Sequence, residues 1–289
     1  MEARPIMLQG TGSDVGKSFI AAALCKIFKD DGYSVCPFKS QNMSSESYII
    51  NTGDEISTAQ AFQAYAAGIE PSVYMNPILL KPKGEMKSDV IILGSSLEIM
   101  SASQYHIDFT LKALDIVRNS YNRLATKYDI IVIEGAGSPA EVNLKASEIV
   151  NMRIAKMTDA PVVLIVDIDR GGAFAWVLGT LELLEPDEIE RVKGIIINKF
   201  RGDKKLLEPA IYDLEKRTNK PVLGVIPYIK DIKMPREDTL GYETNDSKNN
   251  NKTQFDITSL EKNLEILAAT VRENINMKGI YSIVGDLKN

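Results

Sequence analysis

The chain has only one histidine, His106, and two cysteines, Cys25 and Cys36, among its 289 residues. Ser–His and Cys–His catalytic arrangements need a histidine beside the nucleophile, but both cysteines lie in apolar segments and His106 lies in a polar one. A self-contained glutaminase or hydrolase site is therefore not expected. The two cysteines also lack the spacing of metal ligands, and we expect them to be buried, reduced thiols.

An excess of basic residues and a long apolar run are also missing. The net charge is −5 and the pI about 5.2, which argues against a nucleic-acid partner because phosphate binding needs a basic face. No run approaches the ~18 apolar residues of a membrane span. The start, Met-Glu-Ala-Arg-Pro, lacks the regions of a signal peptide. We expect a cytoplasmic protein with small-molecule ligands, and a homodimer is left open.

A glycine-rich segment near the start carries the strongest signal. It ends in Gly16-Lys17-Ser18, between an apolar strand and an apolar helix. Backbone N–H groups of such a loop bind phosphate oxygens, the lysine neutralises the β/γ charge, and the serine hydroxyl is placed to ligate Mg²⁺. The strict motif would place its first glycine at Thr11, whereas the glycine here is Gly10, one residue earlier. This variant spacing reduces the number of nucleotide-binding families to which the loop can belong. We expect ATP binding by Gly12, Ser13, Asp14, Val15, Gly16, Lys17 and Ser18.

Short apolar runs bounded by turn residues recur along the chain. Those without alternation indicate strands buried on both faces, as in a parallel sheet covered by helices. The runs are Ile6–Gln9, Ser34–Phe38, Val90–Leu93, Ile130–Ile133, Val162–Val166, Gly194–Ile197 and Val222–Ile226. The expected fold is α/β, a doubly wound, mainly parallel sheet of the P-loop NTPase type with a C-terminal helical tail.

The composition changes after residue 243. Residues 244–255 are polar and Asn-rich and read as a flexible linker, and residues 256–289 show helical spacing at Leu260–Val271 and Met277–Val284. We therefore expect an ATP-dependent domain at 1–243, a linker at 244–255 and a helical tail at 256–289.

Polar side chains follow several of the expected strands, at the edge where ligands bind in open parallel sheets. Lys39 is expected to face the transferred phosphoryl group, and Gln41 and Asn42 to hold a polar substrate. Glu134 follows the Ile130–Ile133 run and is suited to Mg²⁺ together with Ser18.

Other candidates are less sharply defined by their position. Glu55 is a second expected Mg²⁺ ligand, with Asp54 as the alternative. Asn198 can read the edge of an adenine or cap its strand. Asp167, Asp169 and Arg170 precede two glycines and either approach a ligand or form an ion pair.

Several segments together resemble the ATP-dependent domain of the cobyric acid synthase family, over roughly residues 5–240. They are Gly10–Ser18, Pro37–Met43, Met75–Pro82, Glu134–Leu144, Glu148–Arg153, Asp167–Gly172 and Ile197–Gly202. The loop is also similar to that of dethiobiotin synthetase, which has the same displaced glycine. The Gln-Asn-Met and Ser-Pro-Ala-Glu segments are particular to the cobyric acid branch.

The resemblance implies an ATP- and Mg²⁺-dependent ligase of cobalamin biosynthesis. It would amidate adenosylcobyrinic acid a,c-diamide at carboxylates b, d, e and g, through acyl phosphates attacked by ammonia. Lys17, Lys39 and Glu134 would be catalytic, with the metal on Ser18, Glu55 and Glu134. The corrinoid would lie near Gln41, Asn42, Ser138, Glu141 and Asn143.

Members of that family normally carry a glutaminase domain after the synthetase domain, and this sequence shows none. The closing segment is similar to the tail that follows the glutaminase, so the linker is the expected place of the missing domain. Ammonia would then come from solution or from a separate glutaminase subunit.

Other functions compete with this one. Within the fold they are cobyrinic acid a,c-diamide synthase and a dethiobiotin-synthetase-like carboxylase. A partitioning or regulatory ATPase is disfavoured because its signature lysine position is Gly12 here and a glycine position is Asp14. A corrinoid-binding relic without turnover is a further alternative, against which the intact Lys17, Ser18 and Glu134 argue.

Overall fold

The structure is a computed structural model that describes residues 2–84, 87–101, 110–145, 148–230 and 257–285. His106 and the expected linker at 244–255 lie outside these ranges.

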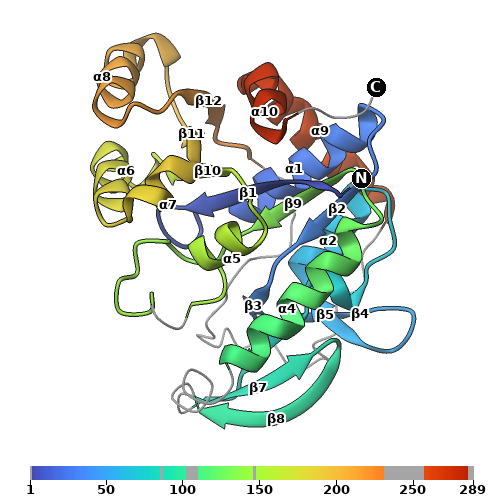
Figure 1. The fold of residues 1–289 in the computed structure, drawn as a ribbon. Coiled ribbons are helices and arrows are strands. Elements are labelled where there is room, and N and C mark those ends of the chain that lie inside the picture. The colour runs from blue at the N-terminus through green and yellow to red at the C-terminus, as the bar shows by residue number, and fades with distance from the viewer. Residues whose placement is uncertain (1, 85–86, 102–109, 146–147, 231–256, 286–289) are drawn as a thin grey trace.

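A six-stranded, wholly parallel sheet forms the centre of the molecule (Figure 1). Its order is β12-β11-β10-β1-β9-β2. The strands are β1 (Arg4–Gly10), β2 (Val35–Phe38), β9 (Ile130–Glu134), β10 (Val162–Asp167), β11 (Val192–Phe200) and β12 (Val222–Pro227). Six of the seven expected strands are thereby confirmed.

Helices cover both faces of this sheet, because successive residues of its strands enter two different hydrophobic clusters. Met7 belongs to a cluster with residues of α4, α5, α6 and α8, whereas Ile6 and Leu8 belong to a cluster with residues of α1, α2, α9 and α10. The helices are α1 (Lys17–Asp30), α2 (Thr58–Ala66), α4 (Thr110–Ala125), α5 (Met152–Met157), α6 (Ala173–Glu182), α7 (Pro186–Arg191), α8 (Glu208–Thr218), α9 (Ile257–Asn274) and α10 (Met277–Val284). The doubly wound class is confirmed.

The seventh expected strand, Val90–Leu93, is also a strand, but it lies in a second sheet. Val90–Leu93 overlaps β7 (Lys87–Ile92), which pairs antiparallel with β6 (Ile78–Pro82) and β8 (Ser95–Ser101). Together with β3 (Gln41–Met43), these strands form a second, four-stranded sheet in the order β3-β6-β7-β8. A buried apolar run does not show which sheet it joins, because the pairing depends on distant segments.

Two short strand pairings were not expected from the sequence. β3 (Gln41–Met43) pairs with β6 inside the polar segment that follows β2, and β4 (Ser47–Ile49) forms a hairpin with β5 (Glu55–Ser57). Short 3₁₀ turns occupy η1 (Val73–Met75) and η3 (Lys204–Leu206).

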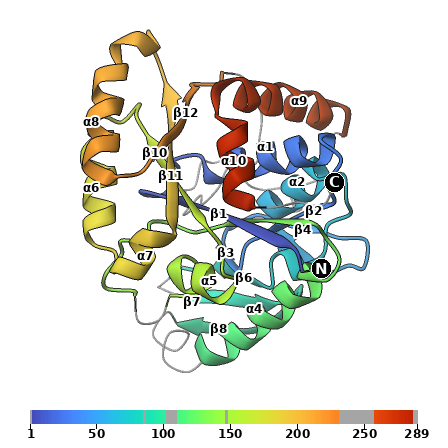
Figure 2. The same ribbon diagram turned by 45° about the horizontal axis from the view of Figure 1, so that its top comes forward.

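The C-terminal helix α9 packs onto the P-loop helix α1, and α10 packs against β1 and contacts α1 through Tyr281 and Phe28 (Figure 2). Leu264, Leu267 and Val271 of α9 share one core with α1. At the end of α1, Asp31 accepts hydrogen bonds from Arg272, at 2.7 Å, and from the hydroxyl of Tyr281. The tail is therefore part of the same hydrophobic core as the sheet. Among the helices of the described ranges, none is long and apolar enough to cross a membrane.

Candidate functional site

The glycine-rich loop joins β1 to α1 as the sequence predicts. Asp14 and Gly16 have φ values of 58° and 100°, so the chain turns sharply before Lys17 begins the helix. A side chain at Gly10 would lie 2.5 Å from Val15 Cγ2 and 2.9 Å from the Gly12 carbonyl oxygen. The displaced glycine is thus required by the packing of the loop on itself.

Lys17 is buried and reaches back over this loop. Its Nζ donates to the carbonyl oxygens of Gly12, at 3.1 Å, and Gly137, at 3.4 Å. The ammonium group therefore lies between the P-loop and the turn that follows β9, where it can meet an anion held by both.

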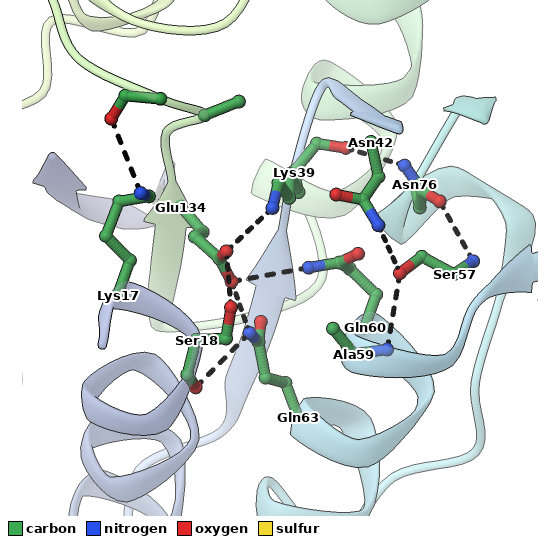
Figure 3. A network of polar contacts seen from close by, with 12 residues as sticks. Lys17, Ser18, Lys39, Asn42, Ser57, Ala59, Gln60, Gln63, Asn76 and Glu134 are labelled. Atoms are coloured by element: carbon green, nitrogen blue, oxygen red, sulfur yellow. Dashed lines mark hydrogen bonds and ion pairs between the residues drawn. The ribbon is translucent and has the colours of Figure 1, made fainter. Parts of the chain in front are cut away.

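Glu134, the last residue of β9, is the centre of a buried polar cluster (Figure 3). Its Oε1 accepts the hydroxyl of Ser18 and the ammonium group of Lys39, each at 2.7 Å. The two charged side chains are 0 and 1% exposed, so the ion pair lies almost wholly out of water. The structure thus brings together Lys17 and Ser18 of α1, Glu134 at the end of β9, and Lys39, which follows β2.

Two glutamines of α2 complete the surroundings of Glu134, and neither was among the expected site residues. Gln63 Nε2 donates to Glu134 Oε2 and to the Ser18 carbonyl oxygen, and Gln60 Nε2 lies 3.4 Å from the same Oε2. The sequence offered one signal for them: the two glutamines lie three residues apart in the helix that begins after Ser57, so they share one helix face.

A second part of the network ties Lys39 to the start of α2. Asn76 donates to the Lys39 carbonyl oxygen at 3.2 Å and accepts the backbone N–H of Ser57 at 3.0 Å. Asn42, expected to hold the substrate, is buried and donates to the Ser57 hydroxyl at 2.6 Å. Asn42 therefore contacts the N-cap residue of α2 and supports the start of that helix.

Glu55 begins β5, and Asp54 precedes it in the β4–β5 hairpin. The structure pairs Glu55 with Lys81, Nζ to Oε2 at 2.7 Å, and Asp54 accepts the hydroxyl of Thr52 at 2.6 Å. Their expected metal role remains a prediction.

Side chains at the carboxyl ends of β10 and β11 contact the P-loop. Asn198 Nδ2 donates to the Val15 carbonyl oxygen at 2.8 Å, and an added Cβ at Gly16 would lie 2.2 Å from that nitrogen. Lys199 donates to the Asp14 carbonyl oxygen and pairs with Asp167 at 2.8 Å. These contacts hold the outer side of the loop.

The remaining residues of this segment form ion pairs. Arg170 lies 3.5 Å from Asp167 and 3.6 Å from Asp14, and Asp169 pairs with Arg201 at 2.9 Å. The ion-pair interpretation of Asp167, Asp169 and Arg170 is confirmed.

A cavity of about 490 Å³ opens beside the P-loop. Of the expected substrate residues, Gln41, Ser138 and Glu141 line it. Asn42 is buried, and Asn143 is exposed on the loop after β9. Ser13 and Gly137 also line the cavity, so it adjoins the groups around Lys17. Its size lies in the range of small-molecule sites.

The far wall of the cavity is a charged network around Glu188 of α7. The carboxylate of Glu188 lies 3.1 Å from both Lys145 and Lys156. Burial raises the pKa of Glu188, but hydrogen bonds from the Glu185 backbone and from the two lysines outweigh it and lower the pKa. This wall is therefore ionised at neutral pH.

The donor set fits a nucleotide with Mg²⁺. Among the described residues, no three His, Cys, Asp or Glu side chains gather to hold a metal. Ser18 Oγ and Glu134 Oε1 supply two hard oxygens in contact, and Mg²⁺ typically takes one or two carboxylates with phosphate oxygens and water. Ser18 and Glu134 would hold it.

The cysteines lie in the core as expected. Both are free and buried. Burial, and then the negative charge of Glu134, raise the pKa of Cys25, and burial likewise raises the pKa of Cys36. Neither thiol is suited to act as a nucleophile.

Comparison with known proteins identifies relatives. Cobyric acid synthase of Pelotomaculum thermopropionicum is 55% identical over 85% of this chain and 47% of its own length. The cobyric acid synthases of Desulfitobacterium hafniense and Moorella thermoacetica are 56% and 58% identical, over 82% and 83% of this chain and 46% and 47% of theirs. The chain spans about half the length of these curated relatives.

Solved structures agree on the fold. The signal recognition particle receptor FtsY of Elizabethkingia anophelis superposes with a TM-score of 0.50 at 15% identity, covering 91% of this chain and 65% of that one. The family described as CobQ/CobB/MinD/ParA nucleotide binding domain matches residues 6–240. With the P-loop, the buried Ser18–Glu134 contact and the parallel sheet in place, this match shows that the chain belongs to the CobQ/CobB/MinD/ParA nucleotide-binding domain family.

Proposed function

We propose that the protein is an ATP-dependent carbon–nitrogen ligase that amidates corrinoid side-chain carboxylates in cobalamin biosynthesis. The observation that carries this proposal is the buried cluster of Lys17, Ser18, Lys39 and Glu134 beside a 490 Å³ cavity. The similarity to cobyric acid synthases supports the substrate, adenosylcobyrinic acid a,c-diamide, with amidation at positions b, d, e and g.

The first step is phosphoryl transfer. A carboxylate oxygen of the substrate attacks the γ-phosphorus of ATP in line, the bond to the β–γ bridging oxygen breaks, and ADP leaves with that electron pair. Lys17, between the P-loop and the turn after β9, neutralises the phosphate charge, and Lys39 approaches the transferred group from the β2 side. Bound Mg²⁺ would supply further charge neutralisation at the phosphate oxygens.

The second step is acyl transfer to nitrogen. Ammonia attacks the carbonyl carbon of the acyl phosphate, the C–O bond to phosphate breaks, and the nitrogen loses one proton as the amide forms. The chain's histidine count and its buried cysteines offer no nucleophile for glutamine hydrolysis. Ammonia would come from solution or from a separate glutaminase subunit.

The corrinoid is proposed to lie in the cavity near Gln41, Ser138 and Glu141, which places its reacting carboxylate beside Ser13 and Gly137. Asn143, on the same loop, would contact the part of the substrate that extends outside. Holding both reactants in one site converts the encounter into an effectively intramolecular step.

The test is product mass and ATP cleavage with adenosylcobyrinic acid a,c-diamide. One reaction contains ammonium chloride and another glutamine alone. A stepwise loss of ~1 Da per amidation, as OH is replaced by NH₂, is expected with ammonium only. Turnover of cobyrinic acid instead would identify an a,c-diamide synthase, and no mass change with any corrinoid acid would overturn the amidation proposal.

A further inference from the structure

Gln60 and Gln63 are buried polar side chains at the site that neither reaction step uses. They lie three residues apart on α2, so they share one face of the helix, and both are fully buried. α2 packs against α1. This face of α2 therefore meets Glu134 and the first turn of the P-loop helix (Figure 3).

The contacts divide the two oxygens of Glu134 between different partners. Oε2 accepts from the amide nitrogens of Gln63 and Gln60. Oε1 accepts from the Ser18 hydroxyl and the Lys39 ammonium group. One oxygen is held by neutral amides from α2, while the other faces the groups that meet nucleotide and metal.

The amides make these contacts at a cost. A carboxylate only accepts hydrogen bonds, so each glutamine must turn its nitrogen toward Glu134. The Oε1 atoms of both glutamines are then buried without a hydrogen-bond partner in the described structure. An unpaired buried polar atom typically costs about 1–3 kcal/mol. Leucine or methionine would fill the same space without that cost, so the amides serve something other than packing.

Gln63 also links Glu134 to the backbone of Ser18. The same Nε2 that donates to Glu134 lies 3.5 Å from the Ser18 carbonyl oxygen. We propose that Gln63, assisted by Gln60, is a positioning residue that holds the Glu134 carboxylate so that Oε1 stays directed at the Ser18 hydroxyl and at a divalent cation bound there. This inference rests on the metal role of Glu134 in the proposed function.

The experiment measures Mn²⁺ binding by electron paramagnetic resonance in the presence of a non-hydrolysable ATP analogue, on the full chain. The variants are Gln63→Leu and Gln60→Leu, which keep the volume and remove the donor. Phe62→Leu is the matched control, because Phe62 lies on the same helix and is buried in the hydrophobic core. It should lower the melting temperature and leave Mn²⁺ affinity unchanged.

Gln63→Leu is expected to weaken Mn²⁺ binding by about 10- to 100-fold, as for other residues that orient a metal ligand. Gln60→Leu should have a smaller effect because its contact is longer. In steady-state assays Gln63→Leu should raise the Mg²⁺ concentration needed for half-maximal kcat. The KM for the corrinoid substrate should stay unchanged.

The outcomes separate this inference from the proposed function. Wild-type-like Mn²⁺ affinity in Gln63→Leu, or an equal loss in Phe62→Leu, would overturn the positioning role even if amidation is observed. A selective loss in Gln63→Leu supports it even if no corrinoid is amidated. Absence of Mn²⁺ binding by the wild-type protein would overturn it together with the metal role of Glu134.

Discussion

Lys39 and Glu134 form an ion pair of 2.7 Å between the residue that follows β2 and the last residue of β9. Both strands are parallel neighbours, so their carboxyl ends place the two side chains together. Since both are excluded from water, each charge depends on the other for its stability.

Replacing Lys39 should therefore affect folding as well as catalysis. Lys39→Met leaves a buried carboxylate without its cation, and we expect the free energy of unfolding to fall by about 3–5 kcal/mol. The double variant with Glu134→Gln should recover much of that loss and remain inactive. Urea unfolding measures the free energy of unfolding of both variants. If Lys39→Met were as stable as the wild type, the buried carboxylate would not depend on Lys39 for its stability.

Ser18→Ala removes one of the two oxygens that would hold Mg²⁺. The Mg²⁺ concentration for half-maximal ATP cleavage should rise by about tenfold or more. Ser120→Ala is the control, because Ser120 is a buried serine of α4 that donates to the Ile116 carbonyl oxygen. An equal change in the two variants would mean that Ser18 is not a metal ligand.

Asn198→Ala distinguishes support of the P-loop from recognition of the base. The amide nitrogen already donates to Val15, so its removal should loosen the loop and weaken ATP and GTP binding by the same factor. Fluorescent nucleotide titrations measure the two dissociation constants. If affinity falls for ATP alone, Asn198 reads adenine, as the sequence suggested.

The contact between the tail and α1 should depend on pH. Burial raises the pKa of Asp31, but the hydrogen bonds from Arg272 and Tyr281 outweigh it, so the pKa is lowered. A carboxyl with a lowered folded-state pKa adds stability above its unfolded value, about 3.9, and loses it as the pH falls through the folded value.

Arg272→Ala should therefore be less stable than the wild type at pH 7, by no more than about 1 kcal/mol because the pair is partly exposed. The difference should close as the pH falls below about 4. Urea unfolding at several pH values measures it. A difference that grows toward acid pH would show that Asp31 is not responsible.

Local patterns were sufficient for the central fold. The apolar runs predict six of the parallel strands because each is buried on both faces, and the Gly-Lys-Ser turn marks the junction of β1 with α1. Glu134 ends β9 at a glycine turn, as the Ile130–Ile133 run predicts, and its metal role stays a prediction.

Contacts between distant segments were not foreseen. The run at Val90 joins a second sheet because its partners are β6 and β8, which the sequence does not indicate. Gln60 and Gln63 carry no motif, and only the packing of α2 on α1 brings them to Glu134. The contact of Asn42 with Ser57 was likewise not indicated by the sequence, and the substrate role of Asn42 stays a prediction.

β12 and the C-terminal tail lie in direct contact, and this contact bears on how well the chain tolerates insertions between them. Gly224 and Ile275 form an antiparallel bridge, and Asn276 donates to the Leu223 carbonyl oxygen, although about fifty residues separate them. Because the two segments are already adjacent, lengthening the stretch between them adds only slowly to the entropy of closure. A fluorescent reporter protein inserted there, with its own termini close together, should leave the sheet intact, which makes this position a natural point for building biosensors of nucleotide binding.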